Sequence, residues 1–246
     1  MTTWIVGDIH GCAEELSELV TSLALKPDDT FVSVGDLFHR GPDPFGVMTI
    51  LRDLKAPFVL GNHERAVLAR CGLAPRRVDA ADRAPVRETF PDLDDADLDG
   101  DGRQPCFVEP HQRVEILRFL QAHSGYALHS RSIRNAGRTP DGRSFLVVHA
   151  GVLPGRRVED HPIDAITSVR RLETSGRPWW YERYEGDDLV LFGHTPSPLP
   201  RAWRARGKLL ALGLDTGCVY GGKLTAYSPE LDEFAVVPAR SAYARR

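Results

Sequence analysis

Two observations predict that this chain adopts an α/β layered fold. Short apolar runs of strand length alternate with amphipathic stretches of helical spacing along most of the chain. Each of the first three strand-like runs also leads directly into a loop that contains Gly-Asp or Gly-Asn. The chain has 246 residues, 42% hydrophobic and 26% charged, which is enough to bury a substantial core. We therefore expect a single domain over residues 1–246, with a surface insertion at about 71–110.

The first third of the chain is predicted to alternate between strands and helices. The first helix is indicated by leucine or valine at positions 16, 19, 20 and 23, which share one helical face. The expected order is strand 3–6, helix 14–24, strand 31–34, helix 44–54, strand 57–60 and a helix that begins near His63.

The insertion differs in composition from its flanks, being rich in Arg, Asp and Pro and lacking sustained periodicity. Its acidic run at 92–102 imitates the start of a calcium loop through Asp97, Asp99, Asp101 and Gly102. Position 12 of that register is Val108, where a bidentate Glu is required, and Pro105 interrupts the loop. We interpret the run as a solvated acidic loop.

The rest of the chain is predicted to return to core structure. A helix at 113–123 is followed by strands at 144–148, 189–192, 209–214, 224–227 and 234–237, with a helical segment at 163–172. The tail from Pro238 to Arg246 is expected to fray.

Composition narrows the classes of protein to consider. The longest apolar runs are far shorter than the roughly 20 residues of a membrane helix, and the N-terminus does not have the pattern of a secretory signal. The four cysteines (Cys12, Cys71, Cys106, Cys218) form no Cys-x-x-Cys pair, and a net charge of −3 gives no bulk attraction to nucleic acid or anionic lipid. We expect a cytoplasmic protein.

Five short motifs follow the strand-like runs and carry the predicted chemistry: GDIHG (7–11), GDLFHRG (35–41), GNHE (61–64), HAG (149–151) and GHT (193–195). Ligands gather at the carboxyl ends of strands in open α/β sheets, so these side chains are expected to converge. A set of Asp, Asn and His without cysteine favours Mn, Fe, Zn or Co over magnesium alone. Two such cations would share a carboxylate and acidify a bridging water, the nucleophile of an in-line displacement at phosphorus.

Each motif taken alone has a simpler explanation. Asp8 or Asp36 could cap a helix, Asn62 could hold a turn, and His149 could be a core histidine with satisfied hydrogen bonds. Five motifs in this order, each at the end of a strand, favour a metal site.

Together these motifs resemble those of the calcineurin-like metallophosphoesterases, in particular the phosphoprotein phosphatases and their bacterial diadenosine tetraphosphatase relatives. The resemblance covers roughly residues 5–226, is weakest over 71–110, and extends to the segment LDTGCVYGGKLTA at 214–226. It implies the four-layer fold of that family, in which two mixed sheets pack face to face and are flanked by helices.

The resemblance also implies roles for individual residues. Asp8 and His10 would bind the first metal, Asp36 would bridge, and the second metal would be completed by Asn62, His149 and His194. Arg40 would hold phosphate oxygens in a bidentate fork, and His63 would donate a proton to the leaving oxygen. A second phosphate-binding arginine would be Arg170 or Arg171. Manganese is the first expectation for both metals, with Fe, Zn, Co or Ni as alternatives.

One position departs from the phosphatase pattern. Protein phosphatases of this superfamily usually have Asp where this chain has His39, and that carboxylate orients the proton-donating histidine. Without it His63 should be a weaker acid, which suits a nucleotide phosphate as leaving group better than a serine alkoxide. The alternative is that another carboxylate, such as Glu64 or one from the insertion, takes the missing role. We therefore rank a bis(5'-nucleosyl)-tetraphosphatase-like hydrolase of dinucleoside polyphosphates first, a serine/threonine protein phosphatase acting on phosphoproteins second, and a non-catalytic scaffold last.

Aromatic residues at 179, 180, 181 and 184 lie just ahead of the predicted strand 189–192. They could offer an adenine ring a stacking surface, although aromatic residues ahead of a buried strand are more often part of the core.

Overall fold

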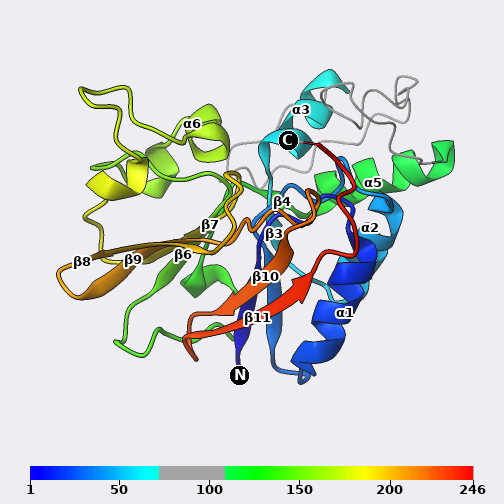
Figure 1. The fold of residues 1–246 in the computed structure, drawn as a ribbon, viewed down its shortest axis with the longest axis horizontal. Helices are drawn as coiled ribbons and strands as arrows, with labels where there is room; N and C mark the ends of the chain where they lie inside the picture. The colour runs from blue at the N-terminus through cyan, green and yellow to red at the C-terminus, as the bar shows by residue number, and fades with distance from the viewer. Residues whose placement is uncertain (72–108, 246) are drawn as a thin grey trace.

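The computed structural model describes residues 1–71 and 109–245, and it contains two β-sheets with helices outside them (Figure 1). The six-stranded sheet has the order β11-β10-β1-β2-β3-β4, and the five-stranded sheet has the order β5-β6-β7-β9-β8. The strands of the first sheet are β1 (Thr3–Val6), β2 (Thr30–Ser33), β3 (Phe58–Val59), β4 (Ser124–Gly125), β10 (Lys223–Ser228) and β11 (Glu233–Pro238). Those of the second are β5 (Ala127–His129), β6 (Phe145–Val148), β7 (Leu189–Phe192), β8 (Arg201–Ala205) and β9 (Lys208–Gly213).

Both sheets are mixed, with parallel strands at the centre. Strands β1 to β4 run parallel to one another; β10 pairs antiparallel with β1, and β11 pairs antiparallel with β10 at the edge. In the second sheet β6, β7 and β9 are parallel, while β5 and β8 are antiparallel edge strands. The predicted pair of mixed sheets flanked by helices is confirmed.

The central strands are buried on both faces, which explains why they appear as continuous apolar runs in the sequence. Ile5 and Val32 of the first sheet pack with Val147 and Leu191 of the second in a core between the sheets. Neighbouring residues on the same strands, such as Trp4, point outward into a core beneath the helices.

Five helices are described: α1 (Ala13–Leu23), α2 (Pro44–Asp53), α3 (Asn62–Arg70), α5 (Pro110–His123) and α6 (Ile163–Ser168). Three short 3₁₀ segments are η1 (Ser130–Ser132), η2 (Val158–Asp160) and η3 (Trp180–Arg183). Helices α1, α2 and α5 lie beside the six-stranded sheet, and α6 lies toward the other sheet (Figure 1).

Several sequence-based expectations differ from the structure. Strands β4, β5 and β8 were not anticipated, and the predicted helix at 163–172 ends at Ser168. The insertion lies outside the described residues except at its ends, so its acidic loop stays a prediction, as does the division into one domain with an insertion.

The expectation that the C-terminal tail frays is wrong for residues 239–245. The Tyr243 hydroxyl donates to Oε1 of the buried Glu15 at 2.8 Å, and the backbone N–H of Arg240 donates to the same oxygen at 2.9 Å. Backbone N–H groups of Tyr243 and Ala244 also donate to the carbonyl of Val219. A buried carboxylate is costly unless it is hydrogen-bonded, so the tail is held where it donates to one oxygen of Glu15.

Over the part of the chain that is described, no helix has both the length and the apolar character needed to cross a membrane.

Candidate metal centre

The predicted metal ligands come from the ends of five parallel strands in both sheets. Asp8 and His10 follow β1, Asp36 follows β2, and Asn62 opens α3 after β3, while His149 follows β6 and His194 follows β7. Backbone hydrogen bonds join these loops to one another. The N–H groups of Ile9 and His10 donate to the carbonyl of Asp36, and the N–H of Gly193 donates to the carbonyl of His149. Six dispersed side chains are thereby brought to one edge of the sandwich.

Asp36 is the centre of the arrangement. Its Oδ2 atom lies 3.7 Å from Nε2 of His10, 3.9 Å from Nε2 of His63 and 3.4 Å from Nε2 of His149. It belongs to two groups that could hold a cation, one with His10 and His63 and the other with His149 and His194. Asp36, the carboxylate expected to be shared by two cations, therefore belongs to both groups.

The second group is completed by an amide. Oδ1 of Asn62 lies 3.1 Å from Nε2 of His149 and 2.8 Å from Nδ1 of His194. Nδ1 of His149 lies 2.9 Å from the carbonyl of Val34, so this nitrogen carries a proton and Nε2 is directed at the site. An amide oxygen and two imidazole nitrogens directed at one carboxylate suit an intermediate divalent cation.

Asp8 joins the first group from the other side. Its Oδ2 atom lies 4.0 Å from Nε2 of His10, and both of its carboxylate oxygens accept the backbone N–H of His194, at 3.1 and 3.0 Å. The His194 loop, which follows β7 of the five-stranded sheet, is thus hydrogen-bonded to Asp8, which follows β1 of the six-stranded sheet.

The backbone at the site adopts strained conformations. His10, Asp36 and His194 all have φ in the left-handed region, at 48°, 50° and 67°. Such conformations cost about 1 kcal/mol or more for residues with side chains, and they persist where the surroundings enforce them. Three of the six candidate ligands share this conformation, which fits a site whose surroundings hold the loops in place.

Glu64 supports the central carboxylate from below. It is fully buried, and its carboxylate accepts the backbone N–H groups of Asp36 (2.9 Å), Leu37 (2.8 Å) and Gly61 (3.0 Å). These bonds fix the loop that carries Asp36. Since its oxygens serve the backbone, Glu64 does not replace the carboxylate that protein phosphatases place beside His63.

The electrostatics of the site fit cation binding. Burial raises the pKa of Asp8, and the nearby Asp215 carboxylate raises it further, well above its usual range. Burial also favours a higher pKa for Asp36, but the imidazoles of His149 and His63 outweigh it and hold this pKa well below the usual value.

The imidazoles divide into two kinds. Burial lowers the pKa of His10 and of His194 to about 3, so both rings are neutral and have lone pairs available. Burial opposes a charge on His149 too, yet the adjacent Asp36 carboxylate raises its pKa to about 10. The proton on His149 satisfies the same carboxylate that a divalent cation would satisfy.

His63 belongs to the first group with His10 and Asp36, and its neighbour His39 is the residue that departs from the phosphatase pattern. The rings of His39 and His63 are 4.6 Å apart between centroids. His39 is buried, and burial together with His63 lowers its pKa well below the usual value, so its ring is neutral. Among the described residues neither ring nitrogen of His39 has a hydrogen-bond partner.

The two predicted phosphate-binding arginines border the site. A guanidinium nitrogen of Arg40 lies 3.4 Å from Nε2 of His10. Arg170 donates to the carbonyl of His194 at 3.4 Å, whereas Arg171 donates to the carbonyl of Arg177 and lies over the ring of Trp179. Of the two candidates, Arg170 is the one in contact with a metal-ligand loop.

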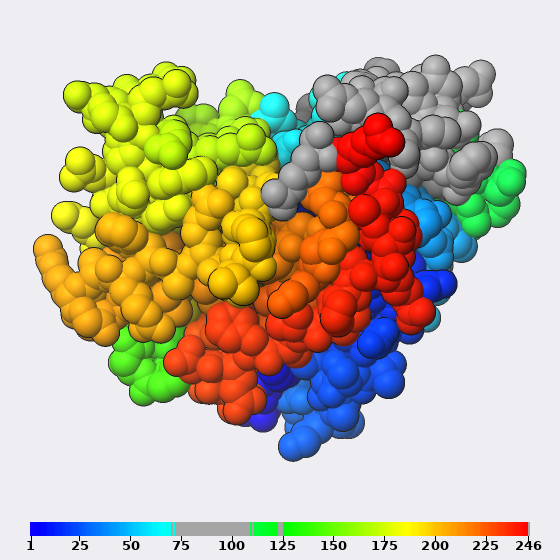
Figure 2. All heavy atoms as spheres, in the orientation of Figure 1, coloured from blue at the N-terminus to red at the C-terminus, as the bar shows by residue number. Residues whose placement is uncertain are grey.

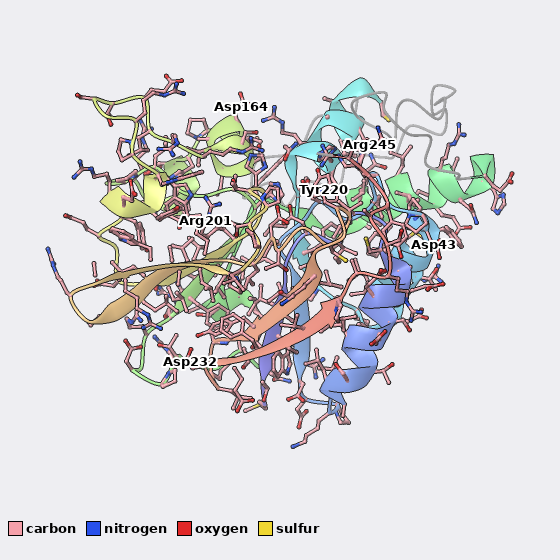
Figure 3. The ribbon with its side chains drawn as sticks, in the orientation of Figure 1. Asp43, Asp164, Arg201, Tyr220, Asp232 and Arg245 are labelled. Carbon is pink, nitrogen blue, oxygen red and sulfur yellow. The ribbon has the colours of Figure 1, made fainter. Side chains whose placement is uncertain are left out.

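Sequence reasoning missed two residues near the site. Asp215 follows the end of β9 as the other acidic residues follow their strands, and its carboxylate acts on the pKa of Asp8. Its place after a strand-like run was the sequence signal that could have identified Asp215 as a site residue. The ring of Tyr220, labelled in Figure 3, lies 5.8 Å from the Arg40 guanidinium carbon. Asp215 and Tyr220 both lie in the segment 214–226 to which the resemblance extends, but no role was assigned to them there.

This fold, with two groups of Asp, Asn and His sharing one carboxylate, defines a metal-dependent phosphoesterase class. The model of the calcineurin-like phosphoesterase family matches residues 1–223, and the chain belongs to this family. It is a hydrolase of phosphoester or phosphoanhydride bonds that uses divalent metal ions.

Three similar proteins lie within that family. The symmetrical bis(5'-nucleosyl)-tetraphosphatase of Janthinobacterium sp. (strain Marseille) is 31% identical, with 92% of each chain covered. The asymmetrical bis(5'-nucleosyl)-tetraphosphatase PrpE of Oceanobacillus iheyensis is 27% identical, with 97% of this chain and 93% of PrpE covered. A crystal structure assigned provisionally as a diadenosine tetraphosphatase is 28% identical with a TM-score of 0.68, covering 97% of this chain and 93% of that one.

Proposed function

We propose that this protein hydrolyses dinucleoside polyphosphates, with diadenosine tetraphosphate as the representative substrate. The observation that carries the proposal is the neutral His39 ring packed against His63, where a protein phosphatase has a carboxylate. The similarity to symmetrical and asymmetrical bis(5'-nucleosyl)-tetraphosphatases over nearly the whole chain supports the same substrate class.

In this proposal Asp8, His10, Asp36, Asn62, His149 and His194 hold two divalent cations, manganese in the first instance. The donor set fits, because carboxylate and amide oxygens are combined with imidazole nitrogens and no thiolate. When bound, the cations supply Lewis-acid polarisation of the phosphoryl group and lower the pKa of water. Asp36 would contribute to both cation positions, and Glu64 accepts the backbone N–H that fixes the Asp36 loop.

The other residues bind the substrate and move a proton. Arg40 and Arg170 border the two cation groups, where their guanidinium groups bind the oxygens of the phosphoryl group under attack. His63 lies 3.9 Å from Asp36 through its Nε2 and donates a proton to the leaving oxygen.

The identity of His39 determines which leaving groups are tolerated. A neutral imidazole does not stabilise a protonated His63 as a carboxylate would, so His63 is a weak general acid. A serine alkoxide needs protonation as it leaves, whereas a nucleoside phosphate leaves as a stable anion. The site therefore favours phosphoanhydrides over phosphoserine.

A direct comparison of two substrates tests the proposal. Manganese-loaded protein is assayed on diadenosine tetraphosphate and on a phosphoserine peptide, with Asp36→Asn as the inactive control. We expect turnover of the dinucleotide, weak or no turnover of the peptide, and loss of activity in Asp36→Asn. Exclusive turnover of the peptide would show a protein phosphatase, and full activity of Asp36→Asn would show that this site is not the catalytic one.

The products of the same assay give the position of cleavage. The similar proteins include both symmetrical and asymmetrical enzymes, so they leave both modes open for this chain. ADP alone would indicate symmetrical cleavage, and ATP with AMP would indicate asymmetrical cleavage.

A further inference from the structure

A pocket of about 780 Å³ is lined by His194 but by none of the other metal-ligand candidates. Most of its lining comes from α6 and the segment that leads to η3, which is coloured yellow-green in Figure 2. Its volume is in the range of ligand sites in proteins. Because His194 lines one end, anything bound there adjoins the metal centre.

The wall of this pocket carries three arginines, Arg170, Arg171 and Arg177. The two acidic residues in the lining are Asp164 and Glu173. Asp164 forms an ion pair with Arg65 of α3, so its charge is already balanced. The pocket therefore has a net positive charge, which suits a polyanion.

Arg171 is held in place. Its guanidinium lies 4.2 Å from the ring centroid of Trp179 and donates to the carbonyl of Arg177 at 2.8 Å. On the same indole, Arg201 of β8 lies 4.4 Å from the ring centroid, and Figure 3 labels this arginine. A guanidinium fixed on an aromatic ring loses less entropy when it binds phosphate than one that is free.

The backbone at Arg170 and Arg171 is also linked to the segment that carries His149. Arg171 and Trp179 pair as an antiparallel bridge, and the N–H of Trp180 donates to the carbonyl of Arg170. The indole of Trp180 is buried and donates to the carbonyl of Ala150, beside His149. The core interpretation of the aromatic residues is thus confirmed for Trp180, and through it the backbone at Arg170 and Arg171 is held near His149.

We propose that Arg171 and Arg177 form a subsite for the distal phosphates of an oligophosphate chain, those beyond the phosphoryl group under attack. This inference rests on the proposed function and deepens it. Arg170, which contacts the carbonyl of His194, serves the reacting phosphoryl group, and Arg171 and Arg177 serve its neighbours along the chain. The subsite selects oligophosphates over monophosphates, because a monophosphate fills only the metal centre.

Equilibrium binding tests the subsite without relying on turnover. Calorimetry on manganese-loaded protein measures the Kd of inorganic phosphate and of a diadenosine tetraphosphate analogue with methylene groups in place of the bridging oxygens. The pocket variant is Arg171→Gln with Arg177→Gln. The control, Arg118→Gln with Arg206→Gln, removes the same charge from an exposed residue of α5 and from the turn between β8 and β9.

We expect the pocket variant to weaken analogue binding by about tenfold or more, since it removes two charged hydrogen-bond donors, and to leave phosphate binding within roughly twofold. The control variant is expected to match the wild type for both ligands, and the single charge reversal Arg177→Glu is expected to weaken only the analogue. Equal losses for both ligands, or an unchanged Kd for the analogue, would overturn the subsite.

The outcome is separable from that of the proposed function. A wild-type protein that fails to hydrolyse diadenosine tetraphosphate contradicts the proposed function, and the titration still measures the subsite. Analogue binding no tighter than phosphate binding in the wild type contradicts the subsite, even if the dinucleotide is hydrolysed.

Discussion

Replacing Gly61 by alanine would direct a methyl group at the carboxylate in the middle of the metal centre. The added Cβ would lie 2.0 Å from Oδ1 of Asp36 and 2.6 Å from its backbone nitrogen, where real contacts stay above 3.0 Å. The carboxylate oxygen must therefore move by about 1 Å to reach 3.0 Å. Rotation of the Asp36 side chain alone does not relieve the contact with its backbone nitrogen. Gly61 has φ −78° and ψ 175°, which alanine adopts readily, so the effect is one of contact and not of backbone strain.

A misplacement of about 1 Å in a reacting group lowers turnover by about 100-fold, and overpacking of a buried site costs about 1–3 kcal/mol of stability. We expect Gly61→Ala to show both effects, with fewer than two manganese ions retained per chain. The assay measures kcat on diadenosine tetraphosphate, metal content after gel filtration, and the free energy of unfolding in urea.

The matched control is Gly125→Ala in β4, where an added Cβ meets nothing within 4 Å and φ lies outside the left-handed region. This variant should keep the metal content and kcat of the wild type. The reasoning is refuted if Gly61→Ala binds two metal ions and turns over at the wild-type rate, or if both alanine variants lose activity equally.

Three further changes have defined outcomes. His39→Asp should strengthen His63 as an acid and raise kcat on a phosphoserine peptide by about tenfold while leaving p-nitrophenyl phosphate nearly unchanged; equal changes on both substrates would contradict this role. Tyr243→Phe removes the hydroxyl that donates to Glu15 and should lower the free energy of unfolding by about 1–3 kcal/mol, measured in urea; no measurable loss would mean that the tail contributes little. Glu64→Gln leaves one of three backbone N–H groups facing another donor and should weaken manganese binding by about 10- to 100-fold in a metal titration, and unchanged affinity would argue against the supporting role.

The central strands were predictable because a short, continuous apolar run fits only a strand that is buried on both faces of a sheet. β1 (Thr3–Val6) and β7 (Leu189–Phe192) were placed at their observed bounds, since a strand buried on both faces is a continuous apolar run. The alternating sequence of β8 (Arg201–Ala205) gave no such run. It is an edge strand whose burial alternates between partial and exposed, so its apolar signal is weak.

The convergence of the ligand side chains was also predictable, because the carboxyl ends of parallel strands meet at one edge of a sheet.

The position of the C-terminal tail was not predictable. Its position depends on Glu15, which is 228 residues from Tyr243, and a helical glutamate gives no sign in the sequence that it is buried. The contact between Arg170 and the His194 loop was equally hidden, because it depends on how the segment before η3 folds back on itself.

The ligands are divided between the two sheets, with Asp8, His10, Asp36 and Asn62 on one and His149 and His194 on the other. A cation held by Asp36 and His149 would therefore crosslink the two halves of the sandwich. Removing it would take away both a link between the two sheets and a group needed for catalysis. Resistance to heat and the capacity to cleave phosphate bonds are thus tied to the same few atoms, and chelation should diminish both together.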